Sequence, residues 1–326
     1  MRDVINWGIL GAGNIAGALV EGIREAGGRV AAVGSRDAER AAVFAGRFDI
    51  PASYGSYEDL LGDDGVDAVY VATTNELHHR NTLDAISAGK AVLCEKPFAL
   101  NAHQGEEMRA AAQSAGVFVM EAMWMRFIPA TVALLQMVER GDLGEIRAVA
   151  ADFSFQANAG PEHRLVDPAL GGGALLDLGL YPISLAMLLL GEPTAISAQA
   201  SIGPSGVDEQ VAASMVFPGG QVGSIYASFL ADSPVEAHVV GTEGRAWVRS
   251  RFHNSERLDV VAPDGSVTVH EYPLAGNGYR FEVAEVHRAL LAGETESSLR
   301  PLADTLSVME VLDGIRAQIG VRYPGE

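Results

Sequence analysis

The stretch WGILGAGNIAG, residues 7–17, decides the fold class of this chain. An apolar run leads through a glycine turn, Gly11-x-Gly13-x-x-Ala16, into a helical pattern. Gly11 allows the turn, Gly13 lets the backbone approach a pyrophosphate at a helix N-terminus, and Ala16 permits close packing of helix on strand. The pattern predicts a dinucleotide site, with a merely structural turn as the alternative. The expected cofactor contacts here are Gly11, Gly13, Asn14 and Ile15.

Short apolar runs alternate with helical patterns through the first part of the chain. Strands are expected at 4–10, 29–34, 67–73, 91–95 and 117–121, and helices near 14–26, 37–47, 57–62, 79–88 and 101–115. Near-continuous apolar strands separated by helices indicate a parallel sheet covered on both faces. Right-handed crossovers then give a doubly wound α/β Rossmann domain, which we assign to residues 1–122.

The rhythm of the sequence changes after Trp124. A helix near 130–140, a long strand at 146–155 and an apolar helix at 174–190 are followed by strand patterns at 194–202, 210–217, 221–230, 235–242, 245–250, 257–262 and 266–272. Helices near 280–292 and 302–319 come last. Successive strands without helices predict a mostly antiparallel open sheet, so residues 123–326 should form an α+β domain for substrate binding and oligomerisation.

One face of this expected sheet is short of charge. In the run 211–217, the alternate residues on one face are Val, Ala, Met and Phe, and the other face carries Ala212, Ser214 and Val216. A solvated sheet face normally carries lysine or glutamate. Burial against another copy, in a homodimer or higher homo-oligomer, explains the pattern, and burial under the chain's own helices explains it equally well.

Composition excludes several classes of partner. The 326 residues carry a net charge of −19, which argues against nucleic acid and anionic membranes as partners. The single cysteine, Cys94, allows no disulfide within the chain and fits a reducing compartment.

MRDVINWGIL lacks a signal-peptide pattern, and the apolar run ISLAMLLLG is too short to span a bilayer. The histidines are scattered, without metal-ligand spacing. We expect a cytoplasmic protein with a small-molecule substrate, no membrane partner and no metal.

The end of the second strand bears on the choice of cofactor. Gly34-Ser35-Arg36-Asp37 lacks an acid at the position where NAD sites usually hold the ribose hydroxyls. Ser35, Arg36 and Arg40 suit a 2′-phosphate instead. The sequence therefore favours NADP, with NAD as the other candidate. The alternative interpretation is a solvated arginine beside an aspartate that serves as a helix N-cap.

Polar side chains follow the next strand, in Thr73-Thr74-Asn75-Glu76-Leu77-His78-His79. The carboxyl ends of strands line the ligand crevice of a doubly wound fold, so we expect Thr73, Asn75 and His78 to contact the cofactor. A helix N-cap followed by exposed histidines is the alternative.

A lysine stands at the end of the strand after that. The chain contains 23 basic residues, yet its only lysines are Lys90 and Lys96, and Lys96 lies in Glu95-Lys96-Pro97. Pro97 cannot continue a strand ladder and holds the preceding residue extended. Glu95 and Lys96 are therefore expected in the same crevice, with a surface lysine in a turn as the alternative.

The stretch GGGALLDLGLYPI, residues 171–183, runs from a loop into the apolar helix. Asp177 and Tyr181 are four residues apart and share a helical face, where polar groups are costly unless they are paired or used. Pro182 should bend this helix. The alternative is a core tyrosine whose hydroxyl is capped by Asp177.

These motifs, in this order, resemble the glucose–fructose oxidoreductase, inositol dehydrogenase and MocA-type oxidoreductase family. The matching stretches are GILGAGNIA, AVLCEKPFAL and GGGALLDLGLYPI. Many members carry histidine in place of Tyr181, and a tyrosine there with EAMWMRFIP is similar to the dimeric dihydrodiol dehydrogenase and NADP-dependent D-xylose dehydrogenase branch. The resemblance implies that Lys96 and Tyr181 are the catalytic pair, that Asp177 supports them, and that the open sheet forms a dimer interface.

A mechanism follows as a hypothesis. The nicotinamide takes the hydride from a sugar, polyol or diol, and Tyr181 takes the hydroxyl proton, its pKa lowered by Lys96. The expected substrate contacts, which also suit core positions, are Trp124, Arg126, Phe155 and Arg164. The competing hypotheses are a non-catalytic sensor that binds a dinucleotide and a sugar, and a reductase acting on a keto-sugar or imine.

Overall fold

The computed structural model describes residues 4–160, 162–274 and 276–326. They pack as two compact units, the first formed by Met1–Trp124 with Ala275–Leu306 and the second by Met125–Leu274 with Ser307–Glu326. The predicted first domain ends at residue 122, and the early segment of the first unit ends at Trp124. The return of a late segment to the first unit differs from the predicted division, which assigned everything after residue 122 to one domain.

The sheet of the first unit is parallel throughout, as predicted. Its described strands pair in the order β3-β2-β1-β4-β5-β6. Their bounds are β1 Asn6–Leu10, β2 Arg29–Gly34, β3 Ala52–Tyr54, β4 Ala68–Val71, β5 Ala91–Cys94 and β6 Val119–Glu121. The order runs outward in both directions from the neighbours β1 and β4. Ligands of doubly wound folds bind at the carboxyl ends of the strands at this switch point.

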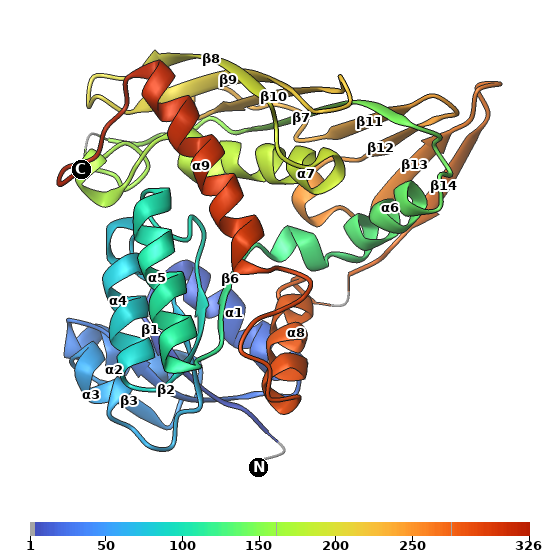
Figure 1. Cartoon of the computed structure of the whole chain (residues 1–326). Coiled ribbons are helices and arrows are strands. Elements are labelled where there is room, and N and C mark those ends of the chain that lie inside the picture. Colours follow the sequence, from blue (N-terminus) through green and yellow to red (C-terminus); the bar gives the residue numbers. More distant parts are fainter. Residues whose placement is uncertain (1–3, 161, 275) are drawn as a thin grey trace. The chain divides into compact units, whose positions relative to one another are not determined.

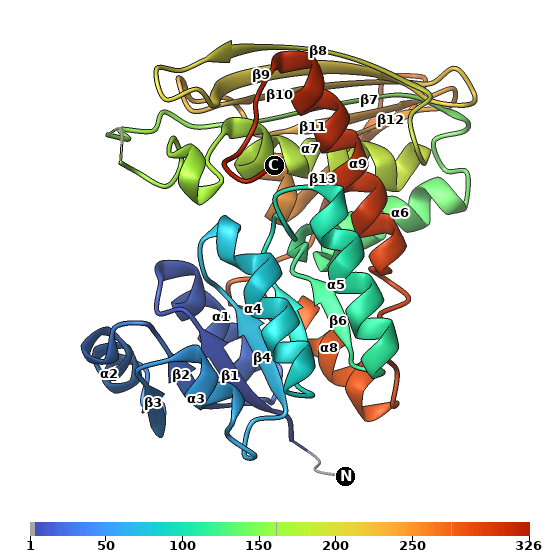
Figure 2. The same cartoon turned by 60° about the vertical axis from the view of Figure 1, so that its left-hand side comes forward.

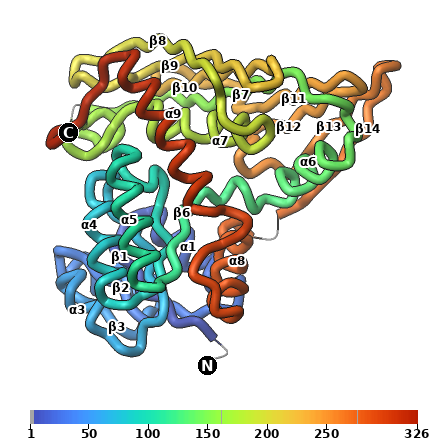
Figure 3. The backbone as a smooth tube through the Cα atoms, in the orientation of Figure 1, coloured from blue at the N-terminus to red at the C-terminus, as the bar shows by residue number. Residues whose placement is uncertain are grey.

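Helices cover this sheet. Their bounds are α1 Asn14–Glu25, α2 Ala38–Arg47, α3 Tyr57–Leu61, α4 Asn75–Ser87, α5 Ala102–Ala115 and α8 Arg280–Leu291. Helix α4 begins at Asn75, one turn before the predicted start near residue 79, and Thr74 is its N-cap residue. Figures 2 and 3 show the late helix α8 beside the early helix α1.

Close backbone contact joins α8 to α1. A Cβ atom on Gly22 of α1 would lie 2.9 Å from the Cβ atom of Tyr279, so the helices approach only because this residue is glycine. The indole Nε1 of Trp7 donates a hydrogen bond of 2.9 Å to Nε2 of His287 in α8. Trp7 itself is fully buried in β1. The late helix is therefore part of the core of the first unit.

The second unit contains the predicted open sheet. Its described strands pair in the order β14-β13-β12-β11-β7-β10-β9-β8, and all pairs are antiparallel except β7 with β10. Their bounds are β7 Ile146–Ser154, β8 Ala195–Ile202, β9 Asp208–Val216, β10 Val222–Ser228, β11 Ala237–Gly241, β12 Arg245–Val248, β13 Arg257–Val261 and β14 Val267–Glu271. The predicted mostly antiparallel architecture is confirmed.

Helices of the second unit lie on one side of its sheet. Helices α6 Pro129–Glu139 and α7 Leu180–Leu190 pack there, while the opposite side is left uncovered in Figure 1. Helix α9 Leu302–Ile319 closes the chain, and 3₁₀ turns lie at η1 Trp124–Phe127, η2 Pro168–Leu170 and η4 Phe252–Asn254. In β9 the apolar set at 211, 213 and 215 is buried, and Ala212, Ser214 and Val216 are exposed. Burial of that second face under the chain's own helices is therefore wrong.

The apolar helix departs from regular α-helical geometry. Leu175–Gly179 (η3) is a π-helical turn that runs directly into α7. Pro182, expected to bend the helix, is the third residue of α7, and because η3 runs directly into α7 its missing N–H falls inside a continuous helical stretch. The helical stretch Pro168–Leu190 has the length and composition of a membrane span, but 83% of its window is buried inside the fold, as in a core helix. It is longer than the apolar run considered in the sequence.

Candidate active site

The glycine turn has the geometry that a dinucleotide needs. Gly11 has φ +106°, and a Cβ atom there would lie 2.7 Å from the carbonyl oxygen of Ala72, so only glycine fits. At Gly13 a Cβ atom would meet no atom within 4 Å, and this residue is the N-cap of α1 without a capping side chain. Bare backbone at an uncapped helix N-terminus suits a pyrophosphate, so the residues present fit the predicted cofactor.

Arginines gather beside this turn, at the end of β2. Arg40 Nε donates a hydrogen bond of 3.2 Å to the carbonyl oxygen of Ala12. Arg36 forms a hydrogen bond with Tyr57, whose pKa is raised by burial and lowered in part by Arg36 and Arg40. Asp37 caps α2 by accepting from the backbone N–H of Arg40, so the predicted N-cap is confirmed alongside the arginines. Tyr57 was missed because the short strand before it gives no clear pattern.

His78 is a buried brace between two strand ends. Its Nδ1 lies 2.7 Å from the carbonyl oxygen of Pro97, and its Nε2 lies 3.1 Å from that of Thr73. Burial lowers the pKa of His78, so the ring is neutral at pH 7. The alternative prediction of an exposed histidine is therefore wrong for His78. This histidine links the end of β4 to the turn that carries Lys96. Asn75, also a predicted cofactor contact, begins α4 in the same region.

Glu95 holds the Lys96 turn from beneath. Its Oε2 accepts a hydrogen bond of 3.0 Å from the backbone N–H of Lys96, and its Oε1 accepts from the hydroxyl of Tyr70. Burial raises the pKa of Tyr70 well above its usual range, which keeps the hydroxyl protonated and able to donate. Glu95 is itself buried. Its described contacts therefore position the backbone that carries Lys96.

More buried carboxyl groups lie in the first unit. Glu121 at the end of β6 pairs with the buried Arg300 and accepts a 3.1 Å hydrogen bond from the hydroxyl of Thr305. Glu282 of α8 is fully buried, and neither of its oxygens has a hydrogen-bond partner among the described residues. Burial raises the pKa of Glu282 well above its usual range, and the charges of Glu95 and Glu121 raise it further. Its surroundings therefore favour the neutral, protonated form of Glu282.

The second unit brings together two of the predicted residues. Asp177 in η3 is paired with Arg164, whose Nη1 lies 3.4 Å from Oδ1 of Asp177. Tyr181 is the second residue of α7 and is buried against aromatic rings, with its centroid 5.4 Å from that of Phe153 and 5.2 Å from that of His253. His253, in η4, was not predicted, because a single histidine between strands carries no pattern.

Two of the remaining predicted substrate residues, Trp124 and Phe155, have aromatic packing partners within their own units. Trp124 stacks on Tyr279 at a centroid distance of 4.3 Å. Phe155 packs edge-on against Phe229 at 5.6 Å. Arg126 lies in η1 and is partly exposed. Contact of these side chains with a substrate stays a prediction.

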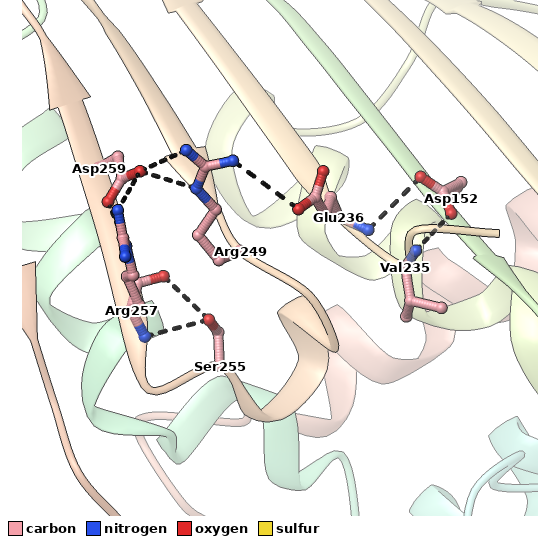
Figure 4. Close-up of polar contacts among 7 residues, drawn as sticks. All are labelled: Asp152, Val235, Glu236, Arg249, Ser255, Arg257 and Asp259. Atoms are coloured by element: carbon pink, nitrogen blue, oxygen red, sulfur yellow. Dashed lines mark hydrogen bonds and ion pairs between the residues drawn. The ribbon is translucent and has the colours of Figure 1, made fainter.

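A polar network holds the segment that carries His253 (Figure 4). Asp259 is almost completely buried between Arg249 and Arg257, with Nε to carboxylate oxygen distances of 2.7 Å to each. Hydrogen bonds from Arg257 and then Arg249 lower the pKa of Asp259. The two arginines flank η4, so this pairing fixes the loop between β12 and β13. At β7, Asp152 accepts a 2.8 Å hydrogen bond from the backbone N–H of Val235.

Comparison with known proteins identifies the family. Residues 5–123 match a family model described as an oxidoreductase family with an NAD-binding Rossmann fold, and residues 131–247 match the GFO/IDH/MocA C-terminal domain. Trans-1,2-dihydrobenzene-1,2-diol dehydrogenase of Mus musculus is 37% identical over 333 residues, covering 98% of each chain. The chain belongs to the GFO/IDH/MocA family of oxidoreductases. The human protein of the same name is 34% identical, again over 98% of each chain.

Solved structures agree with this membership. The aldose-aldose oxidoreductase of Caulobacter crescentus superposes with a TM-score of 0.87 and 27% identity, over 97% of each chain. KijD10, a 3-ketoreductase from Actinomadura kijaniata solved with NADP and TDP-benzene, has a TM-score of 0.87 and 27% identity, over 97% of this chain and 98% of that one. This GFO/IDH/MocA member is an NAD(P)-dependent dehydrogenase, and a non-catalytic sensor is the less supported alternative.

Proposed function

We propose that this dehydrogenase prefers NADP and transfers a hydride between the nicotinamide and a hydroxyl carbon of a sugar, polyol or dihydrodiol. The observation that carries the proposal is the whole-length likeness to enzymes named as dihydrodiol dehydrogenases, at up to 37% identity. The aromatic rings around Tyr181 support it, because flat apolar surfaces beside a polar group suit a sugar ring or an aromatic diol.

The proposed chemistry divides between the cofactor and the chain. The bound nicotinamide supplies the hydride acceptor. Tyr181 takes the proton of the substrate hydroxyl, and Lys96 supplies a compact positive charge that favours the phenolate. A cation about 4 Å away at an effective dielectric of about 20 contributes about 4 kcal/mol, or roughly 3 pKa units before desolvation opposes it. Asp177, paired with Arg164, orients the tyrosine segment.

Kinetics of matched variants test these roles. Lys96→Met and Tyr181→Phe should each lower kcat by about a hundredfold or more and leave the Kd for NADP unchanged. Lys96→Arg should restore little, because a planar guanidinium replaces a point donor. Tyr272→Phe, after the edge strand β14, is the control for loss of a hydroxyl. Purified protein is assayed with NADP⁺ and NAD⁺ against aldoses, inositols and dihydrodiols by absorbance at 340 nm. A kcat within tenfold of wild type in either variant contradicts its assigned role.

The cofactor preference rests on the arginines at the end of β2. Arg36, held by Tyr57, and Arg40 at the glycine turn provide two guanidinium groups for a 2′-phosphate. Arg36→Ala should lower the ratio of kcat/KM for NADP over NAD by about tenfold to a hundredfold, as expected for loss of a charge-assisted hydrogen bond. Arg47→Ala, at the far end of α2, is the matched control. An unchanged ratio contradicts the preference for NADP.

The direction of catalysis has a second candidate. The likeness to a 3-ketoreductase over 97% of this chain favours a reductase that acts on a keto-sugar. The same side chains serve, with Tyr181 donating the proton and Lys96 polarising the carbonyl. Oxidation of NADPH by keto-sugars or imines, with slow reduction of NADP⁺ by all alcohols in the panel, distinguishes this reductase from the dehydrogenase.

We also propose that the protein forms a homodimer through the uncovered face of the second sheet. Val216, Val222 and Val240 expose 42%, 50% and 40% of their surface there. Ser214 of β9 pairs with Ser224 of β10 on the same face. Ser214→Lys should therefore shift the molar mass measured by light scattering to that of a monomer, and Val43→Lys on α2 should not. A monomeric wild type at micromolar concentration contradicts the proposal.

A further inference from the structure

A buried carboxylate lies behind the start of the segment that carries Asp177 and Tyr181. Asp208, the first residue of β9, is fully buried, and its Oδ2 accepts a hydrogen bond of 2.7 Å from the backbone N–H of Leu175. Leu175 is the first residue of η3, which has no capping side chain at its N-cap residue. Asp208 therefore satisfies a helix-start N–H group from a distant strand, and its charge is favourable at this end of a helix.

The backbone of the turn before η3, which contains Gly172 and Gly173, lies directly against the Asp208 carboxylate. Gly173 has φ +127°, and a Cβ atom there would lie 2.6 Å from Oδ1 of Asp208. Gly173 N–H donates to the carbonyl oxygen of Leu165 at 2.8 Å, and Gly173 C=O accepts from the N–H of Asp177 at 3.2 Å. Oδ1 of Asp208 has no hydrogen-bond partner among the described residues. Gly173 thus lies against Asp208 and also accepts the backbone hydrogen bond of Asp177, so a shift of the Asp208 side chain would move the backbone that holds Asp177.

The C-terminal tail braces the same turn. The hydroxyl of the buried Tyr323 donates a hydrogen bond of 2.7 Å to the carbonyl oxygen of Gly172. Arg316 of α9 lies over the Tyr323 ring at 4.9 Å and pairs with Glu326 at 2.8 Å and Asp313 at 2.7 Å. Consecutive residues of the turn, Gly172 and Gly173, therefore contact side chains from the tail and from β9.

The charges around Asp208 come from α9 and the tail. Burial raises the pKa of Asp208 to about 7, opposed by the N–H groups of Leu175 and of Asp208 itself and then by Arg316. Burial, and next the charge of Asp208, raises the pKa of Tyr323 above its usual range, so its hydroxyl stays protonated. Asp313 and Glu326 offset the charge of Arg316. Asp208 is the group in this set that changes charge near neutral pH.

We propose that Asp208 is a positioning residue: it fixes the turn before η3, and with Tyr323 it sets how Asp177 and Tyr181 are presented to the substrate. The assignment rests on the proposed function, because that function gives these residues their roles. A carboxylate accepts the Leu175 N–H more strongly than a protonated carboxyl group does. When Asp208 takes up a proton, its hydrogen bond to the Leu175 N–H therefore weakens. Asp177 and Tyr181 are then held less firmly, and kcat falls.

Asparagine separates position from charge at this site. Asp208→Asn keeps the shape and one oxygen acceptor but does not titrate. We expect kcat to fall about tenfold at pH 8, the KM for NADP to stay unchanged, and the decline of kcat between about pH 8 and about pH 6 to become shallower than in wild type. Tyr323→Phe should lower kcat several-fold and keep the wild-type pH profile. Glu209→Gln, the adjacent carboxylate of β9, is the control and should leave both properties unchanged.

Hydrogen exchange tests the inference without any substrate. Backbone amides of residues 172–181 are followed by mass spectrometry in wild type and Asp208→Asn, with rates corrected for the intrinsic effect of pH. In wild type, protection of the Leu175 amide, whose hydrogen bond can break while Asp208 stays buried, should drop about fivefold or more between about pH 8 and about pH 6, and in the variant it should be low at both. Equal protection in both proteins overturns the inference, even if the enzyme is active. If no substrate of the panel is turned over, the proposed function is overturned. The hydrogen-exchange comparison still tests the role of Asp208 in that case, because it needs no substrate.

Discussion

The buried carboxylate of Asp208 predicts a measurable link between pH and stability. Its pKa rises from 3.8 to about 7 on folding, because burial disfavours the charged form. A shift of about 3 units corresponds to about 4 kcal/mol. Since the folded-state pKa is the higher one, the folded protein binds the proton more tightly. The contribution is therefore fully present below about pH 4, falls as pH rises towards 7, and stays constant above that.

Asp208→Asn removes this titration and isolates it by difference. The unfolding free energy of wild type minus that of the variant should decrease by about 4 kcal/mol between about pH 4 and about pH 8, with nearly all of the change below pH 7. Urea unfolding followed by tryptophan fluorescence gives both free energies, provided that the m-values agree. Glu209→Gln is the control and should leave the Asp208 contribution in place. Parallel curves for wild type and Asp208→Asn across this range would refute the reasoning.

Other predictions concern the first unit. Arg300→Met leaves Glu121 buried without its cation and should lower the unfolding free energy by about 3–5 kcal/mol in urea, and the added change Glu121→Gln should recover more than half of that loss. Glu282→Gln should gain stability relative to wild type as pH rises. The pKa of Glu282 is raised in the folded protein, so the wild type loses the stabilisation from this carboxyl group at high pH, and a difference in unfolding free energy that does not change with pH would contradict this. Gly11→Ala should lower both Tm and cofactor affinity, since φ is +106° there, while Gly13→Ala should weaken NADP binding, measured by calorimetry, with little change in Tm.

Much of the fold could be predicted because strand and helix periods are local properties. The strands before and after Gly11 lie where the apolar runs place them. The strand Ala52–Tyr54 was missed because it is short and only partly buried, so its residues show no alternation. The return of α8 to the first unit could not be predicted, because an amphipathic helix does not reveal which surface it covers. The reason for glycine at Gly22 appears only once that helix is in place.

The candidate site divides in the same way. Lys96 stands after a buried strand, as the sequence indicates, because a proline and an apolar run are local signals. Tyr70, Glu282 and Asp208 were missed because each sits in an ordinary strand or helix pattern. Their importance comes from partners far along the chain, as with the 179 positions that separate Glu121 from Arg300. The catalytic and cofactor roles assigned to the motif residues stay predictions.

The discontinuous first unit has a consequence for how the chain folds during synthesis. The ribosome releases β1 to β6 early, but α8 and Arg300 emerge only after every strand of the second unit. Until then Glu121 has no cation, and the face of α1 around Gly22 has no helix against it. The first unit therefore stays unfinished until the strands of the second sheet have been made, and a nascent chain that has released residues up to 274 should hold those strands paired while its first unit still lacks α8 and Arg300.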